Sequence, residues 1–176
     1  MNVIETARAR LEGFARAQEN QYAGDADRPI AGYMGTMAVY AGVVGALAAG
    51  VKVTGREVPD GLPLTDIGLS ALATHKLSRL LARDPVTSPL RVPFTAYAGT
   101  GGPAEVEEEV RGSGARKTVG ELVTCPFCTG LWVATAFTAG LVYLPRTTRL
   151  TIGTFAALGG ADLLQFAHAW LDKQTS

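Results

Sequence analysis

Long apolar runs alternate with short polar segments over most of this chain. Residues 29–51 contain no charged side chain at all. A helix of this length crosses a hydrocarbon core of about 30 Å. Apolar runs of similar length follow at residues 62–82, 122–144 and 150–171. The pattern predicts an all-α fold, an integral membrane bundle of about four transmembrane helices.

The first run places a small residue at every fourth position, namely at Ala38, Gly42, Ala46 and Gly50. Small side chains allow helix backbones to approach closely, as is typical of helices that associate in membranes. We therefore expect this face to pack against another helix.

The second run is less apolar, because a polar residue recurs at every fourth position from Asp66 to Ser78. Such spacing places these side chains on one helix face. Lys76 and Arg79 fall in the last third, from which long side chains reach the headgroup region. The Asp84-Pro85 step ends the helix, because proline disfavours helical geometry in the residue before it.

The remaining segments are polar. Residues 2–20 have a helical period with apolar residues on one face, which predicts an amphipathic helix that lies on a bilayer or caps the bundle. We take residues 1–28 as this helix and its linker, and 29–171 as the membrane domain. Residues 83–121 are rich in proline, glycine and glutamate, and are interpreted as a polar loop whose glutamates form a solvated face.

The basic residues are unevenly divided between the two sides that four spans would create. The chain has 16 Lys and Arg against 16 Asp and Glu, so no net charge favours nucleic acid as a partner. The side with both termini and the 83–121 loop holds most of the Lys and Arg. Since basic residues stay inside, we expect both termini and this loop to be cytoplasmic in a cell-membrane protein.

A C-x-x-C pair, Cys125 and Cys128, stands at the start of the third run. A first helical turn stabilises thiolates, so the two residues could be packed thiols, a redox pair or half of a zinc site. Structural zinc takes about four ligands, so the remainder would come from His75, His168 or the cysteines of a second copy.

Two further sets of polar residues are candidates for function. Lys76, Arg79, Arg83 and Arg91 could bind the phosphates of membrane lipids, or could instead anchor the helix end and pair with Asp84 or the glutamates. Asp66, Asp162 and Gln165 lie within predicted spans. Ionisable residues there usually face a partner, so they indicate either hydrogen bonding between helices or proton or substrate handling.

Three segments resemble a bacterial membrane-protein family known only as a domain of unknown function (family 1360), found in actinobacteria and spore formers. They are HKLSRLLARDPVTSPLRVPFT at 75–95, EEEVRGSGARKTVGELVTCPFCTGLW at 107–132 and ADLLQFAHAWL at 161–171. The likeness covers roughly residues 62–171. It implies a helical integral membrane protein and carries no established activity or catalytic residue.

The chain contains no phosphate-binding loop, nucleophile elbow, zinc-protease or dinucleotide motif. The leading hypothesis is therefore a non-enzymatic interaction or assembly protein. Its cytoplasmic face would bind membrane lipid headgroups, another membrane or cytoplasmic protein, or a second copy of the chain. The alternatives are a membrane thiol-disulfide oxidoreductase that uses the cysteine pair and a zinc-stabilised membrane scaffold.

Overall fold

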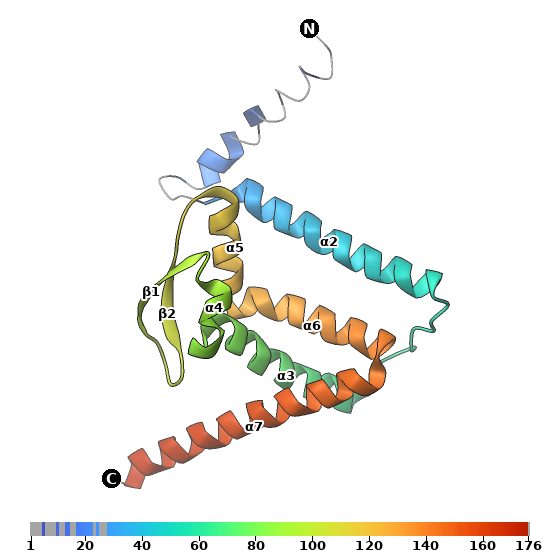
Figure 1. Ribbon diagram of the computed structural model, residues 1–176, viewed down its shortest axis with the longest axis vertical. Helices are drawn as coiled ribbons and strands as arrows, with labels where there is room; N and C mark the ends of the chain where they lie inside the picture. Colours follow the sequence, from blue (N-terminus) through green and yellow to red (C-terminus); the bar gives the residue numbers. More distant parts are fainter. Residues whose placement is uncertain are drawn as a thin grey trace.

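The computed structural model describes residues 5, 10, 13–14, 17–22, 24 and 28–175, and these are mostly helical (Figure 1). The predicted N-terminal amphipathic helix lies largely outside the described residues. The elements are α2 (Ile30–Val53), α3 (Leu64–Arg83), the 3₁₀ turn η1 (Pro85–Thr87), α4 (Ser88–Arg91), β1 (Thr95–Thr100), β2 (Val106–Val110), α5 (Gly114–Thr124), α6 (Pro126–Tyr143) and α7 (Pro145–Thr175).

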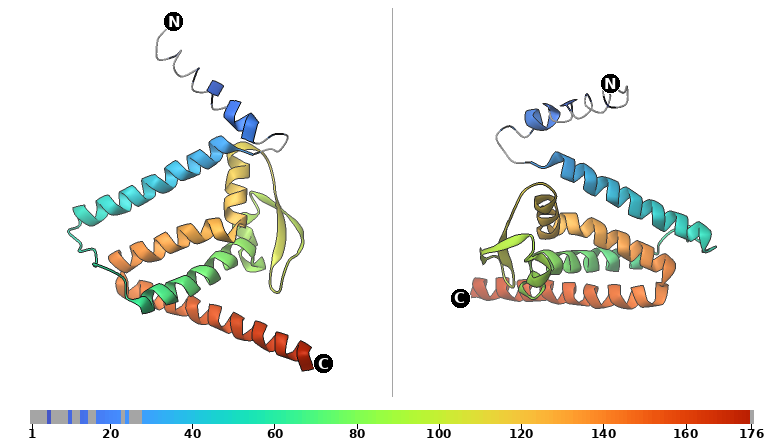
Figure 2. Two further views of the ribbon diagram at one scale, coloured as in Figure 1. Left: turned by 180° about the vertical axis from the view of Figure 1, so that it is seen from behind. Right: turned by 45° about the horizontal axis from the view of Figure 1, so that its top comes forward.

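Helix α3 packs along both α6 and α7, and these three helices enclose the core. The core consists of Ala73 from α3, Val133, Phe137 and Leu141 from α6, and Ile152 and Ala156 from α7. Ala73 is completely buried, so a larger side chain there would separate α3 from its neighbours. The chain runs along the bundle four times, and all four long helices extend between the same two ends (Figure 2).

Helix α2 lies alongside α6 and is joined to it by two tyrosines. The Tyr40 hydroxyl is 2.9 Å from Thr135 Oγ1, and the Tyr143 hydroxyl donates to the Leu47 carbonyl at 2.6 Å. The expected packing of small residues on α2 is found at one of its four positions. A Cβ added to Gly50 would lie 2.6 Å from the Tyr143 hydroxyl, whereas one added to Gly42 would meet nothing within 4 Å.

The all-α prediction is wrong in one respect, because the predicted loop contains a β-hairpin. Strands β1 and β2 pair antiparallel with a bulge between Tyr97 and Gly99, and a tight turn joins them. Glutamate is depleted in strands, which is why the run from Glu107 to Glu109 was interpreted as a solvated loop. The turn sequence Gly101-Gly102-Pro103 between residues of high β-propensity was the available signal.

The predicted loop also contains α5, and two predicted helix limits differ from the observed ones. The third predicted span begins at residue 122, but Cys125 has extended backbone angles and separates α5 from α6. The fourth predicted span begins at residue 150, but α7 begins earlier, at Pro145. Proline is well suited to the first turn of a helix, since its missing N–H has no partner there.

Three helices of the described part of the chain are long and apolar enough to cross a membrane: Ile30–Val53, Pro126–Tyr143 and Pro145–Gln174. Helix α3, the second predicted span, is not among them. Its apolar periodicity is interrupted by the polar stripe that the sequence showed, and this stripe contributes to the packing. The side chains of Thr74 and Ser78 face Gly130 of α6 at ordinary contact distance.

Replacing Phe137 by alanine tests the core. Phe137 is 6% exposed between α3 and α7, so its removal leaves a cavity and lowers the free energy of unfolding by about 3 kcal/mol. Leu131→Ala is the matched control, because Leu131 lies on the same helix and is 51% exposed. Denaturant unfolding of the purified proteins measures both. Equal losses in the two variants would contradict this assignment of the core.

Candidate functional site

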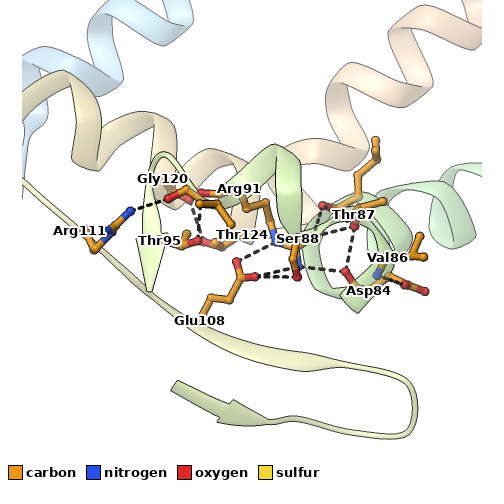
Figure 3. A network of polar contacts seen from close by, with 12 residues as sticks. Asp84, Val86, Thr87, Ser88, Arg91, Thr95, Glu108, Arg111, Gly120 and Thr124 are labelled. Atoms are coloured by element: carbon orange, nitrogen blue, oxygen red, sulfur yellow. Dashed lines mark hydrogen bonds and ion pairs between the residues drawn. The ribbon is translucent and has the colours of Figure 1, made fainter. Parts of the chain in front are cut away.

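Arg91 is the most deeply buried large side chain that the structure describes, with 1% of its surface exposed. Its guanidinium donates to both carboxylate oxygens of Glu108, from Nε at 2.8 Å and from Nη2 at 3.0 Å. It also donates to the carbonyls of Leu81 and Asp84 and to the Thr87 hydroxyl. Figure 3 shows this network between the end of α3, the short α4 and strand β2.

This network attaches the hairpin to the end of α3. Burial alone would raise the pKa of the Glu108 carboxyl, but hydrogen bonds from Arg91, Thr95 and Ser88 outweigh it and hold the pKa below its ordinary value. The ionised pair therefore persists at neutral pH. The guanidinium N–H groups of Arg91 donate to acceptors inside the protein. Arg91 is therefore not available to bind a lipid phosphate, and it is excluded from the predicted set of phosphate-binding cations.

A cleft of about 330 Å³ lies where the end of α3, the hairpin turn and the second half of α7 meet. Three groups of residues line it: His75, Lys76, Arg79, Leu80 and Asp84 from the α3 end, Pro103, Ala104 and Glu105 from the turn, and Gly159, Asp162, Leu163, Gln165, Phe166 and Ala169 from α7. One wall is therefore apolar, and the charged groups come from all three elements.

The two cations of the cleft are each paired with an acid. Lys76 Nζ lies 2.6 Å from Asp162 Oδ2, which joins α3 to α7. Arg79 pairs with Glu105, which joins α3 to the hairpin. A second bridge between α3 and α7, Arg149 to Asp66 at 2.9 Å, lies at the other end of the bundle. The charged residues Asp66, Lys76 and Arg79 of α3 are thus each paired with a residue of opposite charge on a neighbouring element.

The cleft brings together five of the residues singled out in the sequence, namely His75, Lys76, Arg79, Asp162 and Gln165. The others lie elsewhere. Asp66 is paired with Arg149, and Arg83 does not line the cleft. His168 is exposed on α7 and lies 3.5 Å from Asp172.

Cys125 and Cys128 are free thiols at the junction of α5 and α6. The Cys125 sulfur accepts a hydrogen bond of 3.2 Å from the Cys128 backbone N–H, so Cys125 itself caps α6. The hydroxyl of the preceding residue, Thr124, donates instead to the Gly120 carbonyl. Among the described residues no group of three or more His, Cys, Asp and Glu is placed to hold a metal ion. The predicted histidine ligands are therefore not brought to the pair.

The sequence names Asp84 and the glutamate run as alternative partners of the basic residues, and the structure brings Asp84 and Glu105 into the cleft. The sequence does not indicate which cation each acid meets. The Glu105 carboxylate reaches Arg79 only because the hairpin folds back over the end of α3. For Glu105 the available signal was the Gly101-Gly102-Pro103 turn sequence before it and the strand-forming Val106 after it.

Replacing Arg91 by methionine would leave the buried Glu108 carboxylate without its cationic partner. An unpaired buried charge costs about 3–5 kcal/mol, so we expect a loss of this size in the free energy of unfolding. Arg116→Met is the matched control, because Arg116 is exposed and its guanidinium donates to a backbone carbonyl, that of Pro93, and not to a buried carboxylate. Chemical denaturation of both variants makes the comparison, and a loss no larger than that of the control would refute the structural role of Arg91.

The lowered pKa of Glu108 makes the hairpin sensitive to acid. Its stabilisation is present above the unfolded-state pKa and is lost as the pH falls through the lower folded-state pKa. We expect amide exchange in residues 95–110 to rise when the pH falls below the ordinary carboxyl range. After correction for the intrinsic exchange rate, Glu109→Gln should keep this acid-induced rise. In Glu108→Gln the hairpin should already be open at neutral pH.

Comparisons with known proteins agree with the resemblance seen in the sequence. Residues 69–168 match the family described as "Protein of unknown function (DUF1360)". A curated relative, "Sporulation protein YjcA" of Bacillus subtilis (strain 168), is 31% identical over 111 residues, which are 61% of this chain and 94% of the relative. No solved structure matches. The family match includes most of α3 and all of the hairpin, α5 and α6, so the chain belongs to the DUF1360 family of unknown function.

Proposed function

We propose that this chain is a multi-pass membrane protein that binds lipid headgroups in the cleft formed by α3, α7 and the hairpin turn. The observation that carries the proposal is the position of this cleft. It combines charged groups and an apolar wall at one end of a bundle whose helices are long enough to cross a bilayer. An amphipathic ligand has an apolar part that fits the apolar wall and a charged part that fits the charged groups of such a cleft.

The distribution of apolar side chains supports membrane insertion. None of the most apolar stretch of α2 is buried within the protein, and only 17% of the corresponding stretches of α6 and α7 is buried. Exposed apolar area on this scale is unfavourable in water, at about 25 cal/mol per Å². A surrounding hydrocarbon phase removes this cost.

Helix α3 then serves as the fourth crossing, although its composition is less apolar. It packs along α6 and α7 and extends between the same ends of the bundle. Its charged residues Asp66 and Lys76 are paired with α7. Ionisable groups in membranes are tolerated where they face the bundle interior and find partners.

The charge rule supports placing the cleft in the cytoplasm. Arg83 at the end of α3, Arg111 after β2, and Arg116 and Lys117 in α5 lie at the hairpin end of the bundle. The opposite end has Lys52, Arg56, Arg146 and Arg149. Together with the basic residues near both termini, the hairpin end has the excess, so we place it and both termini inside the cell.

The name of the curated relative indicates the cellular process in which that protein takes part. That protein is named as a sporulation protein, and the chain spans nearly its whole length. We propose that this chain serves the same process where its own organism forms spores. A headgroup-binding membrane protein could serve there as an assembly point.

Single-cysteine labelling tests the membrane topology. In a Cys125→Ser, Cys128→Ser background, we expect Asp60→Cys to react with an impermeant maleimide in intact cells. Gly102→Cys in the hairpin turn should react only after permeabilisation. Labelling of both sites in intact cells, or release of the protein from membranes by alkaline carbonate, would contradict the proposal.

Lipid retention tests the cleft. The full-length protein, purified in detergent and mixed with phospholipids, should retain them in native mass spectra. Arg79→Gln should lower retention several-fold, because it removes an exposed cation of the cleft. The matched control is Arg56→Gln at the opposite end of the bundle. Equal retention by Arg79→Gln, Arg56→Gln and the unmodified protein would refute headgroup binding in this cleft.

A further inference from the structure

The charges of the cleft are arranged as pairs of opposite sign. Two cations, Lys76 and Arg79, stand against three carboxylates, Asp84, Glu105 and Asp162. These five side chains together have an excess of one negative charge. An isolated anionic group entering the cleft would meet cations that already have partners. It would leave their carboxylates without a cation, and unpaired charges in a half-enclosed site are costly.

We infer that the cleft is selective for a zwitterionic headgroup that contains both a phosphate and a primary ammonium group, as phosphatidylethanolamine does. This inference rests on the proposed function and names its ligand class. The phosphate would replace the carboxylates as the partner of Lys76 and Arg79. The ammonium would take the place of those cations beside Asp162 and Glu105, so every charged group keeps a partner of opposite sign and the net charge of the cleft is unchanged.

The geometry of the pairs fits this exchange. The Lys76–Asp162 pair joins α3 to α7, and the Arg79–Glu105 pair joins α3 to the hairpin turn, so the cations share one element and the acids come from two others. The pairs are reachable, because the side chains of Arg79 and Asp162 are 47% and 39% exposed. A bidentate contact from the Arg79 guanidinium is well suited to a phosphate.

The remaining lining favours a lipid over a free zwitterion and an amine over choline. Leu163, Phe166 and Ala169 of α7 form an apolar wall beside the charged groups, where the glycerol and first methylenes of a lipid would lie. Asp84 Oδ1 already accepts a hydrogen bond from the Val86 backbone N–H at 2.8 Å, which leaves its second oxygen for a donor. A primary ammonium has N–H groups to donate to these carboxylates, whereas a quaternary ammonium has none.

The test is a competition between headgroups. The full-length protein in detergent is mixed with equal amounts of dioleoyl phosphatidylethanolamine, phosphatidylglycerol and phosphatidylcholine, and the retained lipid is counted by native mass spectrometry. We expect phosphatidylethanolamine to be retained several-fold more than the other two. Excess soluble phosphoethanolamine should displace little of it, because it lacks the apolar part.

Variants then invert the selectivity. Glu105→Gln combined with Asp162→Asn converts the excess of one negative charge into an excess of one positive charge, so the preference should change to phosphatidylglycerol. Glu105→Gln alone changes an exposed pair at the hairpin turn and should weaken the ethanolamine preference without unfolding the bundle. Glu109→Gln is the control, since Glu109 is exposed on the same hairpin and does not line the cleft.

The outcomes separate this inference from the proposed function. Retention of phosphatidylglycerol equal to that of phosphatidylethanolamine, with a loss of both in Arg79→Gln, overturns the selectivity and leaves headgroup binding standing. Retention that no cleft substitution changes overturns both. Displacement of the lipid by soluble phosphoethanolamine at similar concentration would assign the cleft to a soluble zwitterion and overturn the lipid as its occupant.

Discussion

The buried ion pair between Arg91 and Glu108 determines where the hairpin lies, and the polar end of the molecule depends on it. Arg91 is held at the end of α3 by the Leu81 and Asp84 carbonyls, and it receives the Glu108 carboxylate in a two-point contact. Such a pair is costly to bury unless every donor finds an acceptor, and here the guanidinium nitrogens do. A buried pair of this kind fixes a geometry more than it adds net stability.

The position of Glu108 fixes the position of Glu105. The strand carrying Glu108 begins at Val106, directly after the turn, so fixing Glu108 against α4 brings the turn residues over the end of α3. Glu105 then reaches Arg79, and Pro103 and Ala104 form part of the rim of the cleft. The same pairing explains why the basic residues near the end of α3 are not a simple phosphate clamp: Lys76, Arg79 and Arg91 each already have a carboxylate partner.

Close approach of α5 to the hairpin governs the other contacts at this end of the molecule. Helix α5 lies against the hairpin at Gly120, where an added Cβ would be 2.5 Å from Val110 Cγ1 and 3.2 Å from the Phe94 carbonyl oxygen. The α5–α6 junction that follows is capped by the Cys125 sulfur. The C-P-F-C motif, the most conspicuous signal in the sequence, therefore has a local structural role here as a helix cap.

The sequence by itself determined the long helices, because their signals are local. The uncharged run of α2, the apolar run of α6 and the proline that ends α3 act through neighbours a few residues away. Even the polar stripe of α3 was evident from its four-residue spacing. Only the tertiary structure decided which of these polar residues meet. Lys76 and Asp162 are distant in the chain, as are Arg79 and Glu105, and no periodicity encodes such pairs. The burial of Arg91 depends on the same long-range contacts. The sequence leaves this arginine either to lipid phosphates or to pairing with an acid, and the folded hairpin decides for a buried pair with Glu108.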